Sequence, residues 1–177
     1  ATMTQTETST QPASASLQRA YRDGPLRRER QKVHKLSIVI PVYNEEATVQ
    51  ELVDLVVNAP LPGGLEREII CINDCSTDNT RQRLDELPGM YPDVQFQIVH
   101  KPKNQGKGAA LRDGFAKASG DVVLIQDADL EYDPADYRKL LQPIVEDRAD
   151  VVYGSRFIGE PHRVLYFWHT VGNKFLT

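Results

Sequence analysis

The sequence predicts an α/β fold with a mainly parallel sheet and helices on both of its faces. Short apolar runs rich in β-branched residues recur along the chain, and segments with helical spacing of apolar residues alternate with them. Strands and helices that alternate over short links form right-handed βαβ units, whose strands run parallel. A length of 177 residues suits one such domain with some additional tail.

Five apolar runs are predicted to form the strands of this sheet. They cover residues 36–42, 68–74, 94–100, 121–127 and 149–155. Runs of this length that lack a polar alternation are typical of strands buried on both faces of a parallel sheet.

The segments between these runs are predicted to be helical. Apolar residues in 45–60 follow the i, i+3, i+4, i+7 spacing of a helix, and Pro60 ends the pattern. Further helices are predicted over 77–87 and 106–118. Another is expected to open at Asp133–Pro134, because aspartate caps helices and proline fits their first turn.

The N-terminal part of the chain differs from this periodic region. Residues 1–18 are rich in Thr, Ser, Gln and Ala, so we expect a disordered tail. Residues 19–35 hold seven Lys or Arg against two acids. This basic neck is open to two interpretations. It lies on anionic lipid, where each cation adds about 1 kcal/mol, or it is a solvated arm or a short helix docked on the domain.

Cysteine usage and hydropathy suggest a cytoplasmic protein, peripheral to the membrane if the neck binds lipid. Cys71 and Cys75 are spaced C-x3-C without a histidine pair, so we expect reduced thiols, with Cys71 packed in a strand. No apolar run approaches the roughly 18 residues that span a bilayer. No nucleic-acid partner is expected.

Polar side chains follow the predicted strands, and carboxylates dominate among them. Asp74 follows the second strand, and Asp127 and Asp129 follow the fourth. The carboxyl ends of parallel strands meet at one edge, where ligands bind. Helix capping does not explain three acids at that edge, and like charges repel unless a cation lies between them. Such carboxylate oxygens fit Mg²⁺ or Mn²⁺, and a diphosphate would supply further oxygen ligands to the same ion.

Four ordered motifs make a resemblance specific. The segments SIVIPVYNEE, INDCSTDNT, NQGKGAALRDGFAKASGDVVLIQDADLEYDP and VVYGSRF resemble the family 2 glycosyltransferases, which have the GT-A fold, a Rossmann-like α/β fold. Within that family the chain most resembles dolichyl-phosphate mannose synthases and polyprenyl-phosphate glycosyltransferases. The resemblance covers about residues 36–177.

The resemblance implies a nucleotide-sugar site at the strand ends. Pro41, Tyr43 and Glu45 would line the nucleoside pocket, and Asp74 would recognise the base. The segment with Asn104, Gly106 and Lys107 would lie beside the nucleotide. The DAD motif, which consists of Asp127, Ala128 and Asp129, would flank the ribose and diphosphate. The implied metal ligands are Asp127, Asp129 and Glu131, the last at a position where many relatives carry glutamine.

The implied reaction is an inverting transfer from GDP-mannose or a UDP-sugar to a polyprenyl or dolichyl phosphate. The catalytic set would be Asp127 and Asp129 with Arg156 and Arg163, because arginine binds phosphate in a planar fork. An ionised lipid phosphate needs no general base, whereas a hydroxyl acceptor would need one. The apolar run 164–168 is either a lipid-facing helix or ordinary core.

Other interpretations stay open at this point. The resemblance implies a continuation beyond Thr177, so we expect the domain over 36–177 to be truncated, with exposed apolar surface that favours a dimer. The chain is alternatively a non-catalytic nucleotide-sugar-binding or scaffold domain, or a transferase to a hydroxyl acceptor. A nucleotidyltransferase would be expected to carry a Gly-rich, basic loop after the first strand, where this chain has the acidic PVYNEEATV.

Overall fold

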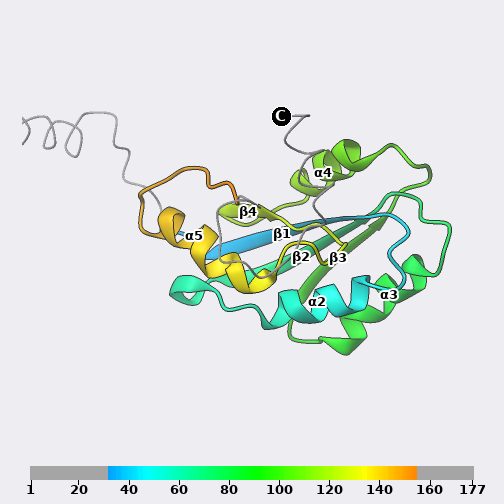
Figure 1. Ribbon diagram of the computed structural model, residues 1–177, viewed down its shortest axis with the longest axis horizontal. Coiled ribbons are helices and arrows are strands. Elements are labelled where there is room, and N and C mark those ends of the chain that lie inside the picture. Colours follow the sequence, from blue (N-terminus) through cyan, green and yellow to red (C-terminus); the bar gives the residue numbers. More distant parts are fainter. Residues whose placement is uncertain (1–31, 155–177) are drawn as a thin grey trace, which may run out of the picture.

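The computed structural model describes residues 32–154, and strands and helices alternate along this part of the chain (Figure 1). The strands are β1 (Lys35–Val42), β2 (Glu66–Asn73), β3 (Gln95–His100) and β4 (Val122–Ile125). The helices are α2 (Val49–Asn58), α3 (Thr80–Met90), α4 (Lys107–Phe115) and α5 (Tyr137–Val145), with 3₁₀ turns at Pro62–Gly64 and Pro134–Asp136. The predicted start at Asp133–Pro134 is confirmed, since the Asp133 carboxylate accepts a hydrogen bond from the Ala135 amide at 2.9 Å.

The four strands form one parallel sheet in the order β3-β2-β1-β4. Ile38 at the centre of β1 pairs with Ile69 of β2 on one side and with Leu124 of β4 on the other. All three side chains are buried. The predicted parallel sheet is therefore confirmed, and the carboxyl ends of its strands lie at one edge.

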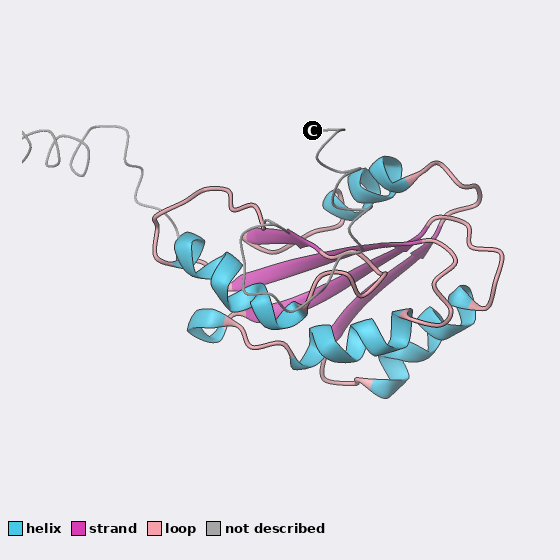
Figure 2. Ribbon diagram, in the orientation of Figure 1, coloured by secondary structure: helices cyan, strands magenta, loops and turns pink. Residues whose placement is uncertain are grey.

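Helices cover the two faces of the sheet unequally (Figure 2). The main core lies between one face and α2, α3 and α5, and it includes Ile40, Leu52, Leu84 and Leu141. A smaller core around Ala110 joins α4 to the opposite face of β1 and β2. Among the described helices, α4 is the one that covers this second face.

Gly114 permits the close approach of α4 to the sheet. A Cβ atom at this position would collide with the side chain of Val39 in β1. The glycine is thus required by packing, and it lets the last turn of α4 lie against β1 and β2.

A buried carboxylate closes the end of the sheet opposite to the strands' carboxyl ends. Glu68 is fully buried and accepts hydrogen bonds from the Ser37 hydroxyl at 2.5 Å and from the amide and hydroxyl of Ser119, both at 2.7 Å. Lys35 forms an ion pair with it at 2.7 Å. Burial alone would raise the pKa of Glu68, but Lys35 and the hydroxyl and amide donors outweigh burial and lower this pKa to about 2.

Two sequence-based predictions are wrong. Residues 149–154, the described part of the predicted fifth strand, form no strand, and Val151 and Tyr153 are exposed there. The fourth strand is shorter than predicted, and Val123 and Ile125 are about half exposed on it. An apolar run becomes a two-sided buried strand only where neighbours cover both faces and edges, and no described element covers this face of β4.

Several predicted segments lie outside the described residues. They are the tail over 1–18, the neck up to residue 31, the two candidate arginines Arg156 and Arg163, and the apolar run 164–168. The structure places Lys35, the last residue of the predicted neck, inside β1. Within residues 32–154, none of the helices has the length and apolar character that crossing a bilayer requires.

Candidate nucleotide-sugar site

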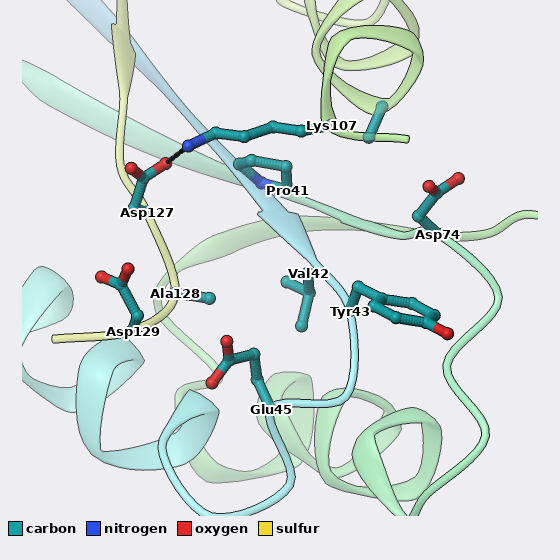
Figure 3. Close-up of a pocket in the computed structure, with 10 residues that line it drawn as sticks. Pro41, Val42, Tyr43, Glu45, Asp74, Lys107, Asp127, Ala128 and Asp129 are labelled. Atoms are coloured by element: carbon teal, nitrogen blue, oxygen red, sulfur yellow. Dashed lines mark ion pairs between the residues drawn. The ribbon is translucent and has the colours of Figure 1, made fainter. Parts of the chain in front are cut away.

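A pocket of about 170 Å³ opens at the carboxyl ends of β1, β2 and β4 (Figure 3). Its walls come from the strand ends and from the first turn of α4. The residues that line it are Pro41, Val42, Tyr43, Glu45, Asp74, Lys107, Ala110, Asp127, Ala128 and Asp129. The eight residues predicted to bind the nucleotide sugar are thus brought together in one pocket, whereas their individual roles stay predictions.

The DAD motif forms one wall of the pocket. The side chain of Asp127 is mostly buried, and one of its carboxylate oxygens lies 2.6 Å from the ammonium nitrogen of Lys107 across the pocket. Ala128 is buried between the two acids. Asp129 is exposed, and its Oδ1 accepts a hydrogen bond from the Glu131 amide at 3.0 Å. The motif therefore offers one acid already paired with a cation and one that is open to solvent.

The loop after β1 forms the facing wall. Tyr43 is 47% exposed, which leaves an aromatic face available at the pocket. Asn44 has a positive φ of 56°, and its side-chain oxygen accepts a hydrogen bond from the Thr77 amide at 2.8 Å. Glu45 accepts one from the Thr48 hydroxyl at 2.6 Å, and its amide donates to the buried Thr80 hydroxyl at 2.8 Å. These bonds tie the pocket loop to the start of α3.

Asp74 lies at the end of β2 and is almost wholly buried. Its carboxylate accepts hydrogen bonds from the amides of Gln105 and Gly106, the shortest at 2.6 Å, and lies 2.9 Å from the ammonium of Lys101. Burial would raise the pKa of Asp74, but Lys101 and the two amides outweigh it, so the pKa lies below its ordinary value. Asp74 is therefore ionised at neutral pH.

The acids of the pocket fit a divalent cation that is coordinated both by protein carboxylates and by a phosphate of the substrate. Mg²⁺ commonly binds through one or two carboxylates, with substrate phosphates and water completing its octahedron. Asp127 and Asp129 supply two hard oxygen donors beside one pocket. Within residues 32–154, no three His, Cys, Asp or Glu side chains are grouped as a complete metal cage. Glu131, the third predicted ligand, is not among the lining residues of the pocket.

Sequence reasoning missed several residues that shape the pocket. Val42 and Ala110 line it. Lys101 and Thr80 do not line it but bind residues that do, through the Lys101–Asp74 ion pair and the hydrogen bond from the Glu45 amide to the Thr80 hydroxyl. Asn104, which was predicted to lie beside the nucleotide, accepts a hydrogen bond from the Gly106 amide at 3.1 Å and so shapes the turn before α4. The register of the sheet could have indicated Lys101. Lys101 follows β3 and Asp74 follows the neighbouring parallel strand β2, so the two residues lie side by side.

Comparisons with known proteins agree on one family. The family model described as glycosyl transferase family 2 matches residues 37–176. A dolichol-phosphate mannosyltransferase of Pyrococcus furiosus is 36% identical over 124 residues, which are 70% of this chain and 34% of that protein. An undecaprenyl-phosphate 4-deoxy-4-formamido-L-arabinose transferase of Proteus mirabilis is 34% identical over 126 residues, 71% of this chain and 38% of that protein.

Solved structures show the same arrangement of elements. The mannosyltransferase PcManGT of Pyrobaculum calidifontis, solved with GDP-Man and Mn²⁺, matches with a TM-score of 0.53 and 24% identity over 70% of this chain and 36% of that one. Residues 1–349 of TarS from S. aureus match with a TM-score of 0.52 and 26% identity over 64% of this chain and 32% of that one. The chain thus spans about a third of the length of the relatives it matches.

Proposed function

Because the chain belongs to glycosyl transferase family 2, we propose that it forms the donor-binding part of an enzyme that transfers a sugar from a nucleoside-diphosphate sugar to a polyprenyl phosphate. The named acceptors of two relatives, dolichol phosphate and undecaprenyl phosphate, support the acceptor class. Both acceptors join a phosphate to a long polyprenyl chain.

One observation carries the proposal: an exposed aromatic ring, a lysine and two acids line a single pocket. Tyr43 offers a face on which a nucleoside base stacks. Lys107 is a cation positioned for diphosphate oxygens, and Asp127 and Asp129 are acceptors for ribose hydroxyls or a divalent cation. The base, the ribose and the diphosphate of a nucleoside-diphosphate sugar therefore each have a matching group in the pocket.

The reaction follows from how charge moves. An oxygen of the acceptor phosphate forms a bond to the anomeric carbon while the bond from that carbon to the diphosphate breaks, which inverts the configuration. The nucleoside diphosphate leaves with the electron pair of the broken bond. In this proposal the Lys107 ammonium stabilises the negative charge that develops on the leaving diphosphate. A cation held by Asp127 and Asp129 would act as a Lewis acid on the same leaving group.

The acceptor side of the proposal depends on residues outside the described part. We propose that Arg156 and Arg163 offset the negative charge of the lipid phosphate as it approaches the diphosphate. The acceptor phosphate is already ionised, so no general base is required of the pocket. The basic neck would keep the chain close to the anionic surface that holds such a lipid.

Binding of donor nucleotides with Mn²⁺ tests the proposal. We expect GDP or UDP to bind in calorimetry, and Asp129→Asn to weaken this binding by about tenfold or more, because a charged ligand is lost. Asp93→Asn is the matched control, since Asp93 is an exposed acid in the turn before β3. If neither nucleotide binds the parent chain, or if Asp129→Asn binds as tightly, the site assignment is wrong.

A further inference from the structure

Lys101 is a buried cation behind the pocket. It directly follows β3, and only 7% of its surface is exposed. Its ammonium lies 2.9 Å from Oδ1 of Asp74 and 3.5 Å from Oδ2 of Asp113, which projects from α4. Taking an ammonium out of water is costly unless opposite charges surround it. The two carboxylates compensate for that burial, so the position of Lys101 depends on both.

Asp74 extends this ion pair into the turn before α4. Its carboxylate also accepts hydrogen bonds from the amides of Gln105 and Gly106. Gly106 has a φ of 83°, in the left-handed region that favours glycine, and is the residue immediately before α4. The ends of β2 and β3, the turn and α4 therefore meet at the Asp74–Lys101 pair.

The turn determines where Lys107 lies. Lys107 is the first residue of α4, and its ammonium crosses the pocket to Asp127 at 2.6 Å. A shift of the turn would move this ammonium and the Asp74 carboxylate together. Two walls of the pocket thus depend on the same buried pair.

We propose that Lys101 is a positioning residue of the nucleotide pocket, which fixes the Asp74 carboxylate and, through it, the turn from which Lys107 reaches Asp127. This inference rests on the proposed function and adds to it a residue that does not touch the pocket. Lys101 acts through Asp74, so its loss changes the binding of the nucleotide while the fold persists.

The charge of Lys101 has a separate signature in the pH dependence of binding. Burial raises the pKa of Asp74, and the Lys101 ammonium and the amides of Gln105 and Gly106 bring it below the ordinary value. Lys101 is the charged side chain paired with this carboxylate, and Asp113 of α4 reaches the same ammonium from its other side. Without the ammonium, the effect of burial is opposed by the amides alone, so the pKa of Asp74 rises. Binding is then lost at a higher pH than in the parent.

The test compares Lys101→Met with Lys101→Arg, which restores the charge. Binding of GDP and UDP with Mn²⁺ is measured by calorimetry between about pH 3 and pH 8, a range that includes the ordinary titration of carboxyl groups. We expect Lys101→Met to weaken binding by about tenfold at neutral pH and to move the acid loss of binding to higher pH. Lys101→Arg should restore the parent profile. Lys139→Met, at an exposed lysine of α5, is the matched control.

Each outcome decides the matter. Lys101→Met that binds with the parent's affinity and pH profile overturns the inference alone, while a parent that binds neither nucleotide refutes the proposed function as well. If Lys101→Met fails to fold, Lys101→Gln keeps a donor to Asp74 without the charge. That variant should still show the displaced pH profile, and an unchanged profile would overturn the inference.

Discussion

Replacing Glu68 with glutamine removes a negative charge from the buried end of the sheet and retains the shape of the side chain. The Ser119 amide and the Lys35 ammonium each donate to an oxygen of the Glu68 carboxylate. In glutamine one of these oxygens is replaced by an NH₂ group, so at least one of the two donors loses its acceptor. A carboxyl whose pKa falls from 4.5 to about 2 on folding stabilises the folded state at neutral pH. We therefore expect Glu68→Gln to destabilise the protein.

The size of the effect follows from the pKa and from the solvent exposure of the partner. The full depression of the pKa corresponds to roughly 3 kcal/mol. The side chain of Lys35 is 23% exposed, so water screens part of its attraction. We expect a loss of about 2 kcal/mol in the free energy of unfolding, or roughly 8 °C in melting temperature for a domain of this size.

The dependence on pH gives the assay its sharpest form. The folded-state pKa of Glu68 is depressed, so its contribution is present above pH 4.5 and is lost as the pH falls toward about 2. Urea unfolding at several pH values should show the parent and Glu68→Gln converging over this interval. Glu66→Gln, at an exposed glutamate of the same strand, should change stability by less than about 0.5 kcal/mol. A constant difference between Glu68→Gln and the parent over this interval would refute the reasoning.

Packing and thiol burial give two further expected outcomes. Gly114→Val should lower the free energy of unfolding by about 3 kcal/mol in urea titrations, because the new side chain collides with Val39; Gly108→Ala in the same helix has room and should not destabilise the protein. Burial raises the pKa of Cys71 to about 12, so an alkylating reagent should label the partly exposed Cys75 first. Mass spectrometry of the digested protein that shows Cys71 labelled in the folded state would contradict this burial.

Sequence patterns predicted the strands whose two faces are both covered. β1 and β2 begin and end within two residues of their predicted positions, because their β-branched runs pack against helices on both sides of the sheet. The same type of pattern failed at residues 149–154 and overestimated the burial of Ile125. Apolar periodicity reports the tendency of a segment to be buried, whereas burial itself depends on which neighbours reach it.

The pocket was predictable because parallel strands end at one edge, and the GT-A fold is confirmed by the parallel sheet and by the solved glycosyltransferases that match it. The ion pairs Asp74–Lys101 and Lys107–Asp127 could not be predicted from the sequence in the same way. Asn73 pairs with His100 in the β2–β3 register, so Asp74 and Lys101 follow neighbouring strands side by side. That pairing requires knowing that β3 lies next to β2. The contact between Lys107 and Asp127 requires the position of α4 as well.

Because one edge of β4 is exposed, self-association has to be measured in any experiment on the acids of the pocket. Val123 and Ile125 are half exposed on a strand that pairs with β1 on one side and with no described strand on the other. Strands of this kind tend to pair with strands of other molecules, and charges at their ends oppose this. Asp121 and Asp127 flank β4, but Asp127 is mostly buried beside Lys107, and the Asp121 carboxylate accepts hydrogen bonds from the His34 and Lys35 amides. Self-association through this edge would mimic a loss of binding, so variants of the pocket acids require light scattering before any loss of binding is attributed to the pocket.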